Sequence, residues 1–278
     1  LAPVEVAPGD PCALMYTSGT TGRPKGAIRS HEGNTLIALA TALEMRFTRD
    51  DVALLVMPMC HANSLYFSHT FVHLGATCVI DDRRSFDPEA LLATLCSDKV
   101  TFTSLVPTHY IMLLGLPAAI KAKYDVGAVA KLMISSAPAR KETKLAIMEY
   151  FRNGQLYELY GSTEAGWVTL LHPEEQFDRM GSVGREWVGS GPIRLLDAEG
   201  KEVADGEVGG LYSRTPYVFD GYWKNPEKTS EAFQGAWRSV GCGRLHPPRG
   251  PQKHHDHQRR REHLPLRGGK RHWSPPQG

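Results

Sequence analysis

The chain has 278 residues, of which 41% are hydrophobic and 22% charged, as expected of a globular protein with a sizeable core. It lacks any run of about 18 apolar residues, which excludes a transmembrane helix, and its five cysteines lack the paired spacing of a disulfide framework or zinc site. The net charge of +2 is unevenly divided, because residues 241–278 carry nine basic and two acidic side chains and the first 240 carry 23 and 28. We therefore expect a cytoplasmic protein with reduced thiols, a mildly acidic body and a basic tail.

Short apolar runs alternate with amphipathic segments through the first 160 residues. We expect a buried strand at residues 13–16 and further strands at 52–56, 77–80, 100–106, 132–134 and 156–160. Helices are expected at 90–95, 107–114, 141–151 and 34–43, the last with Leu36, Leu39, Ala40 and Leu43 on one face. Asp87 and Pro88 are typical of a helix start. Strands that alternate with helices over short links predict a parallel sheet and an α/β fold.

The pattern changes near Gly181, where glycines become frequent and strands become short. Strands are predicted at residues 192–197 and 208–212, each between turns, which indicates a small antiparallel β subdomain appended to the α/β part. The expected organisation is an α/β part at residues 1–180, a β-rich subdomain at 181–240 and a tail at 241–278.

A glycine-rich loop with many hydroxyl groups follows the first expected strand. Residues 16–26 read Tyr-Thr-Ser-Gly-Thr-Thr-Gly-Arg-Pro-Lys-Gly. Glycines let backbone N–H groups approach an anion, hydroxyls donate hydrogen bonds, and a lysine adds positive charge, which together suit the phosphates of a nucleotide. The loop is not a Walker loop, since no Gly-Lys-Ser/Thr follows, and such a composition alone usually marks an ordinary turn. The candidate ligands are Thr17, Ser18, Gly19, Thr20, Thr21, Gly22 and Lys25.

A second motif lies at the end of the last expected strand. Residues 157–164 read Tyr-Glu-Leu-Tyr-Gly-Ser-Thr-Glu and offer an aromatic ring, hydroxyls and a carboxylate where ligand-binding groups gather in parallel sheets. A helix cap formed by residues 162–164 is the alternative without a ligand. Residues 135–138, Ser-Ser-Ala-Pro, form a turn after another strand, and His61 follows the strand that ends near Pro58.

The two motifs together resemble the signatures of the adenylate-forming (AMP-binding) superfamily, which includes acyl- and aryl-CoA synthetases, luciferases and the adenylation domains of peptide synthetases. The resemblance covers about residues 9 to 240 and is closest to an acyl-CoA synthetase. It implies an α/β large domain of which this chain carries the second part, so that the first part, the hinge and the small C-terminal domain are missing. The chain starts without Met, as expected if it begins inside a larger coding sequence.

The resemblance also implies roles for individual residues. Thr20 and Lys25 would neutralise phosphate charge, Thr163 would contact the α-phosphate, and Glu164 would hold Mg²⁺, which prefers oxygen ligands. Tyr160 would lie against adenine. Further nucleotide contacts are expected from Ser136, Ala137, Pro138, Glu158 and Gly161, and His61 would lie near the entrance for the carboxylate substrate, although a lone histidine after a strand is as often structural.

The implied reaction joins a carboxylic acid to CoA in two steps at the expense of ATP, with Mg²⁺ as the metal. The expected partners are therefore a small-molecule carboxylate, ATP and CoA, without nucleic acid. We expect fatty acids, because residues 133–168 offer small and apolar side chains without a charged selector; aryl and amino acids remain alternatives. The C-terminal domain of the family supplies a further lysine, so this chain should bind nucleotide with little or no turnover.

The tail departs from the family. Relatives place a ribose-binding aspartate after the glycine at position 241, where this chain has Cys242, and residues 241–278 contain six prolines, six histidines and too few apolar residues for a core. Permitted codons for residues 266–274, shifted by one base, give Ser-Gly-Gly-Glu-Asn-Val-Ile-Gly, which resembles the family sequence beyond the hinge. We therefore expect a frameshift between Val240 and Arg244. A nucleic-acid-binding tail on a non-catalytic fragment is the alternative of another class.

Overall fold

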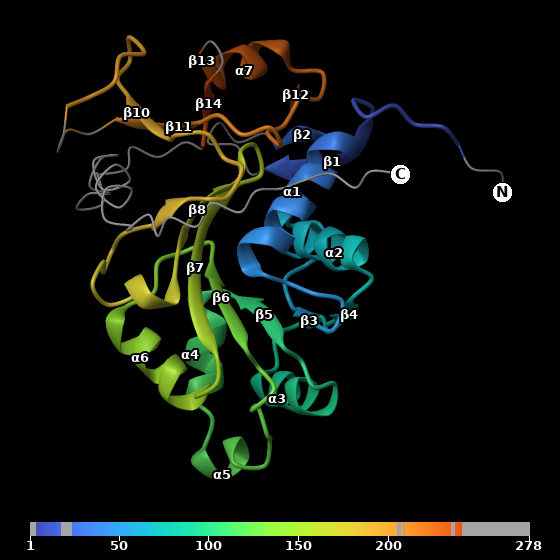
Figure 1. The fold of residues 1–278 in the computed structure, drawn as a ribbon, viewed down its shortest axis with the longest axis vertical. Helices are drawn as coiled ribbons and strands as arrows, with labels where there is room; N and C mark the ends of the chain where they lie inside the picture. The colour runs from blue at the N-terminus through green and yellow to red at the C-terminus, as the bar shows by residue number, and fades with distance from the viewer. Residues whose placement is uncertain (1–3, 18–23, 205–206, 208, 235–236, 241–278) are drawn as a thin grey trace, which may run out of the picture.

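A seven-stranded sheet forms the centre of the protein (Figure 1). The computed structural model describes residues 4–17, 24–204, 207, 209–234 and 237–240. The strand order is β4-β3-β5-β6-β7-β8-β9, parallel through β7 and antiparallel from β7 to β9. The strands are β3 (Val52–Leu55), β4 (Thr77–Ile80), β5 (Phe102–Leu105), β6 (Lys131–Ser135), β7 (Gln155–Ser162), β8 (Gly166–Leu171) and β9 (Arg185–Glu186).

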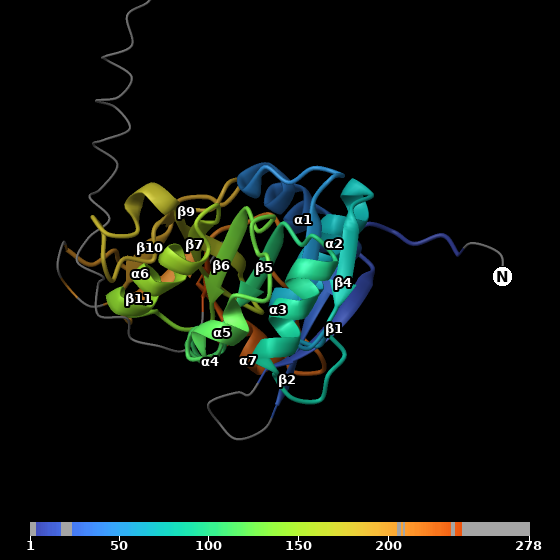
Figure 2. The ribbon, with the colours of Figure 1, turned by 90° about the horizontal axis from the view of Figure 1, so that it is seen from below.

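Helices cover both faces of this sheet (Figure 2). Successive side chains of a strand point to opposite faces, so Ala53 and Leu55 pack with α1 and α2 whereas Leu54 packs with α3, α4 and α6. The two resulting cores have the α/β arrangement predicted from the sequence. The helices are α1 (His31–Met45), α2 (Ala62–Leu74), α3 (Pro88–Ser97), α4 (Pro107–Leu114), α5 (Ala118–Lys121) and α6 (Lys141–Tyr150), with a 3₁₀ turn at Pro173–Glu175.

Two smaller antiparallel sheets lie at the end of the large sheet (Figure 1). One has the order β1-β2-β12 and the other β10-β11-β14-β13. Residues 181–240 are therefore shared among three sheets, since β9 extends the large sheet and β12 joins the N-terminal hairpin. The elements are β1 (Pro11–Thr17), β2 (Lys25–Ser30), β10 (Arg194–Leu196), β11 (Gly210–Ser213), β12 (Gly221–Tyr222), α7 (Pro226–Glu231), β13 (Phe233–Gln234) and β14 (Trp237–Ser239).

Most of the expected elements are confirmed. The helix at 107–114 has the predicted bounds, and α3 begins at Pro88 after Asp87, whose Oδ1 accepts hydrogen bonds from the N–H groups of Glu89 (3.0 Å) and Ala90 (3.1 Å). The last parallel strand continues two residues past Tyr160, to Ser162. Helix α2 was not predicted, because its residues 62–74 mix aromatic, β-branched and polar side chains without a clear apolar period.

Two expectations about burial are wrong. The strand at 13–16 forms, but Leu14 and Tyr16 are exposed, because β1 is the edge of the β1-β2-β12 sheet and has one open face. Helix α1 buries Ile37, Ala38 and Met45 instead of the leucine face, and Leu39 and Leu43 are exposed. Leu36 and Ala40 of the leucine face are partly buried against the same core, so the covered face of α1 is turned relative to its leucines and includes the large side chains of Ile37 and Met45.

Other expectations lie partly outside the described residues. The tail at 241–278, with Cys242, falls there entirely, so its frameshift interpretation stays a prediction, as do the domain boundaries at 180 and 240. The four cysteines within the described ranges are free thiols. No helix in the described part of the chain is long and apolar enough to cross a membrane.

The aromatic cluster beneath α2 provides a test of the core. Phe102 of β5 is fully buried, with ring centroids 4.8 Å from Phe47 and 4.7 Å from Phe67. We expect Phe102→Ala to lower the free energy of unfolding by about 3–5 kcal/mol, because it leaves a cavity between rings that cannot close around it. Denaturant unfolding measures the loss, and Val72→Ala, at an exposed position of α2, should change it by less than about 0.5 kcal/mol. Equal effects of both variants would contradict the packing described.

Candidate functional site

The loops that follow parallel strands meet at one edge of the large sheet. Residue Ser135 ends β6 and pairs with Leu159, so β7 continues past β6 by three residues, from Tyr160 to Ser162. The turn after β6 therefore lies beside the projecting end of β7. Ser136, Ala137, Pro138 and Gly161 are all exposed there. The carboxyl ends of strands are where open α/β sheets bind ligands, so these residues lie at the expected edge.

A buried amide links the start of α2 to the ends of β5 and β6, beneath these loops. The Nδ2 of Asn63, near the start of α2, donates to Ser104 Oγ of β5 (2.7 Å) and to Ser135 Oγ of β6 (2.9 Å). All three residues are buried. The exposed His61 lies two residues before Asn63 and has a hydrogen bond from its own N–H to Pro58 O (2.9 Å). The network therefore attaches the start of α2, and the neighbouring His61 with it, to the ends of β5 and β6.

The turn after β6 has an unusual backbone. Ser136 has φ of 68°, in the left-handed region that non-glycine residues rarely adopt. The N–H of Ala139, which closes the turn, donates to Glu158 Oε1 (3.4 Å). The other oxygen of Glu158 forms an ion pair with Lys144 of α6, whose side chain is only 1% exposed. Glu158 thus connects the turn to α6, through an ion pair with Lys144 that is largely shielded from water.

Lys25 and Glu164 are brought together by a tyrosine. The Nζ of Lys25 donates to the hydroxyl of Tyr222 (3.2 Å) and lies 4.2 Å from the centroid of its ring. The same hydroxyl donates to Glu164 Oε1 (2.7 Å). The three residues come from β2, from β12 and from the turn between β7 and β8, which lies beneath the β1-β2-β12 sheet (Figure 1). One hydroxyl group therefore bridges a cation and an anion that are 139 positions apart in the numbering.

Strand pairing explains the position of Tyr222. It pairs with Ala27 of β2, and residues two apart on a strand share a face, so Tyr222, Lys25 and Arg29 lie on the same face of this sheet. The N–H of Tyr222 donates to Thr229 Oγ1 (2.8 Å). Gly221 has φ of 145°, and a Cβ there would lie 2.9 Å from the Thr229 side chain. Only glycine fits this close approach, which holds Tyr222 in place.

The environment of Tyr222 keeps its hydroxyl protonated. Burial raises the pKa of the phenol far above its usual value of 10, and the hydrogen bond to Glu164 and the negative charge of that residue raise it further. The phenol therefore remains a donor to Glu164 throughout the physiological pH range.

Burial also raises the pKa of Tyr160, whose ring packs against the cluster of Ala165, Val168, Leu211 and Val240.

A buried arginine lies under the Glu164 turn. The Nη2 of Arg29 donates to Tyr217 O (2.5 Å), and its Nη1 lies 3.5 Å from the carbonyl oxygens of both Thr163 and Glu164. Its guanidinium is 5.0 Å from the centroid of the Tyr66 ring, and the Tyr66 hydroxyl also donates to Thr163 O (3.3 Å). Arg29 is fully buried and makes no ion pair with the described residues, so its positive charge is held by backbone dipoles at this turn.

The structure thus places the predicted residues in two groups. Ser136, Ala137, Pro138, Tyr160 and Gly161 lie together at the ends of β6 and β7, whereas Lys25 and Glu164 meet through Tyr222, with the half-buried Thr163 adjacent in sequence. Thr17 ends β1, and its buried hydroxyl oxygen has no hydrogen-bond partner among the described residues. Ser18, Gly19, Thr20, Thr21 and Gly22 lie outside the described residues.

Sequence analysis missed four residues that support this site: Arg29, Asn63, Lys144 and Tyr222. Arg29 has a recoverable signal, because Lys25, Ala27 and Arg29 alternate along one strand and therefore share a face. The other three act across long sequence separations, for example 58 positions between Tyr222 and Glu164. No local pattern marks such contacts.

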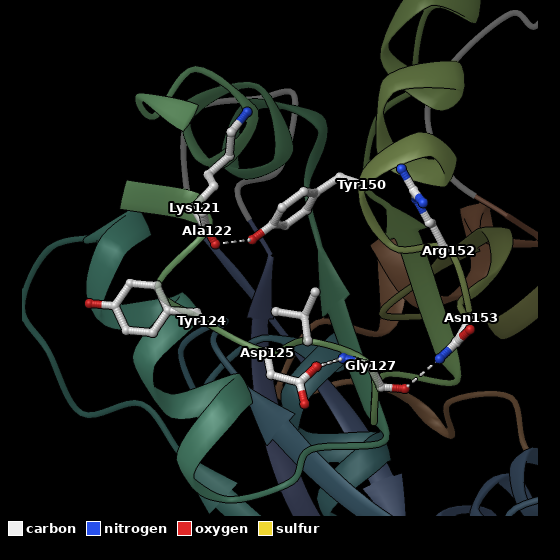
Figure 3. Close-up of a pocket in the computed structure, with 9 residues that line it drawn as sticks. Lys121, Ala122, Tyr124, Asp125, Gly127, Tyr150, Arg152 and Asn153 are labelled. Carbon is white, nitrogen blue, oxygen red and sulfur yellow. Dashed lines mark hydrogen bonds between the residues drawn. The ribbon is translucent and has the colours of Figure 1, made fainter. Parts of the chain in front are cut away.

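A separate hollow lies at the opposite end of the sheet, between α5 and the end of α6 (Figure 3). It has a volume of about 400 Å³, and its lining includes Tyr124 and Arg152. Many of its polar groups already bond to one another: Asn153 Nδ2 donates to Gly127 O (3.0 Å) and the N–H of Gly127 donates to Asp125 Oδ1 (2.9 Å). It contains none of the predicted site residues.

The geometry defines an α/β protein with a group of charged and polar side chains near the carboxyl edge of its sheet, which makes this edge the candidate site. The model of the family "AMP-binding enzyme" matches residues 1–223. The chain therefore belongs to the AMP-binding enzyme family, as the motifs indicated.

Relatives and solved structures agree with this assignment. The chain is 33% identical over 234 residues to a feruloyl-CoA synthase of Amycolatopsis, covering 84% of this chain and 46% of that protein. It is 29% identical to a medium/long-chain-fatty-acid–CoA ligase of Mycobacterium tuberculosis, covering 87% and 41%. The N-terminal domain of FACL13 from M. tuberculosis matches with a TM-score of 0.78 and 25% identity, covering 86% of this chain and 58% of that one. ATP-bound MatB from Rhodopseudomonas palustris matches with a TM-score of 0.74 and 31% identity, covering 87% and 47%.

The chain spans about half the length of the curated relatives that it matches. The family and the fold of the matched part follow from these comparisons. The relatives are named for different acids, a feruloyl group in the first and a medium- or long-chain fatty acid in the second.

The ion pair between Lys144 and Glu158 can be tested separately from nucleotide binding. Lys144→Met leaves the Glu158 carboxylate largely buried without its partner and should lower the free energy of unfolding by about 3–5 kcal/mol. The double variant K144M/E158M removes both charges and should regain most of that loss. Denaturant unfolding measures both effects. If Glu158 also contacts nucleotide, the double variant will bind ATP more weakly despite its restored stability; a double variant as unstable as K144M would contradict the pairing described.

Proposed function

We propose that this chain is the ATP-binding part of a ligase that activates a carboxylic acid and transfers it to CoA. In the first step a carboxylate oxygen attacks the α-phosphorus of ATP, and pyrophosphate leaves with the electrons of the broken P–O bond. In the second step the CoA sulfur attacks the acyl carbonyl, AMP leaves, and the thiol proton is released. The observation that carries the proposal is that Lys25 and Glu164 both bond to the hydroxyl of Tyr222. The two charged residues belong to the two motifs that the chain shares with the family.

Phosphoryl transfer depends mainly on positioned charge. Lys25 supplies a cation whose ammonium has three donor hydrogens. One is donated to the Tyr222 hydroxyl, and among the described residues no other acceptor is bonded to this ammonium, so it can also donate to phosphate oxygens. Thr163 and Thr20 would add hydroxyl donors. Tyr160, Ser136, Ala137, Pro138 and Gly161 would surround the base and sugar at the ends of β6 and β7, with His61 on the side where the acid enters.

The residues present fit a magnesium ion. Mg²⁺ is usually held by one or two carboxylates together with substrate phosphates and water. Glu164 uses Oε1 for Tyr222, and its Oε2 accepts no hydrogen bond from the described residues, so one oxygen is free for a metal. The described ranges hold no cluster of three or more His, Cys, Asp or Glu side chains. When bound, Mg²⁺ would neutralise phosphate charge.

We favour a fatty or similar acyl substrate, because the stretch of residues 133–168 offers small and apolar residues and no obvious charged selector. Aryl acids are the second candidate, supported by the resemblance to a feruloyl-CoA synthase. Fatty acids and aryl acids differ in the shape of the pocket that they need. Pyrophosphate release with a panel of fatty, aryl and amino acids would separate them, measured on this chain and on a chain extended to the length of its relatives.

Lys25→Met should weaken the binding of Mg·ATP about tenfold to a hundredfold, because it removes a charged donor to phosphate, an interaction of about 1.5–3 kcal/mol. Isothermal titration calorimetry measures the dissociation constant directly and needs no turnover. AMP should be affected less than ATP, because AMP lacks the β- and γ-phosphates.

Lys123→Met is a matched control, since it removes the same charge far from the site, where Lys123 pairs with Glu89 at 3.8 Å. It should leave the dissociation constant unchanged. Failure of the unaltered chain to bind Mg·ATP, or equal affinity of the Lys25 variant, would refute the proposed function.

A further inference from the structure

The Tyr222 hydroxyl stands between two groups of opposite charge. Lys25 Nζ and Glu164 Oε1 both bond to it, at 3.2 Å and 2.7 Å, and the two charged groups make no ion pair within 4.0 Å of each other among the described residues. Lys25 has a flexible stem and a strong electrostatic attraction to a half-buried carboxylate. The spacing between the two charges is therefore set by the hydroxyl and not by the charges themselves.

We infer that Tyr222 is a positioning residue, which keeps Lys25 and Glu164 apart so that each can face its own part of Mg·ATP. The inference rests on the proposed function, since it assigns Lys25 to phosphate and Glu164 to the metal. Without the hydroxyl, the ammonium and the carboxylate would close into a direct ion pair. Nucleotide and metal would then have to break that pair before they bind, and both would bind more weakly.

The surroundings make Tyr222 suited to this role. Its ring is held by β12, by the Thr229 contact and by Phe219, whose ring centroid is 4.9 Å away. Only 7% of the residue is exposed. The ring also offers its face to the Lys25 ammonium, which further restrains that side chain. A phenol held by its neighbours therefore lies between the two charged side chains.

Tyr222→Phe tests the inference, because it removes the oxygen and keeps the ring in place. We expect Mg·ATP to bind about tenfold more weakly by calorimetry. The unaltered chain should bind ATP more tightly with Mg²⁺ than in EDTA. This difference in affinity should be smaller in Y222F, because Glu164 then pairs with Lys25 instead of the metal. In EDTA, the double variant Y222F/E164Q should bind ATP more tightly than Y222F does, since Lys25 is released. Loss of packing alone would not produce this recovery.

Tyr110→Phe is the matched control. It removes a buried tyrosine hydroxyl of α4 that donates to Met133 O of β6 (3.1 Å), in the core that packs α3, α4 and α6 on the large sheet and contains neither Tyr222 nor Lys25 nor Glu164. It should leave Mg·ATP affinity unchanged. Unchanged affinity in Y222F would overturn the inference. Tighter binding would overturn it as well, because it would mean that the hydroxyl blocks the phosphates.

A second measurement does not depend on nucleotide. Lys25→Met and Glu164→Gln are combined in a double-mutant cycle on the melting temperature, in the unaltered chain and in the Y222F background. A direct ion pair in Y222F should raise their non-additivity by about 2–4 °C. If the unaltered chain bound no nucleotide but the cycle showed this increase, the proposed function would fail and the spacing role of Tyr222 would stand. Equal non-additivity in the two backgrounds would overturn the spacing role.

Discussion

The buried guanidinium of Arg29 joins the two sheets from which the site is built. It extends from β2 to the carbonyl oxygens of Thr163, Glu164 and Tyr217, and it lies against the ring of Tyr66 on α2. A cation without a carboxylate partner is costly to bury, and these backbone dipoles and the aromatic face offset that cost. The Glu164 turn is thereby attached to the strand that carries Lys25.

The carboxyl edge of the large sheet combines exposed loops with a rigid base. Ser136, Pro138, Gly161 and His61 are open to solvent, whereas the Asn63 amide and the Lys144–Glu158 pair hold the same loops from beneath. Binding residues on loops need such support, because a small displacement of a charged group reduces its interaction with a ligand. The polar groups beneath these loops thus hold the exposed residues in fixed positions relative to one another.

Some expectations about burial failed, because which face of a helix or strand is exposed to solvent depends on segments that are distant in the sequence. The leucines of α1 form an apolar stripe in the sequence, yet Leu39 and Leu43 are exposed, since the helix buries another face, with Ile37, Ala38 and Met45. The strand at 11–17 has apolar residues on both faces, yet it lies at an edge. Periodicity identifies an amphipathic element, but which face is covered depends on what packs against it.

Local sequence determined the elements, the family and the two motifs. Alternating strands and helices, the Asp87 cap and the segment 157–164 are short-range patterns, and each was found before the fold was known. Only the tertiary structure revealed that Lys25 and Glu164 meet through Tyr222, that Arg29 is buried beneath them, and that Asn63 joins the start of α2 to the ends of β5 and β6. These contacts connect residues up to 197 positions apart. They exist because β12 pairs with β2 and because parallel strands bring their carboxyl ends to one edge, which no local pattern records.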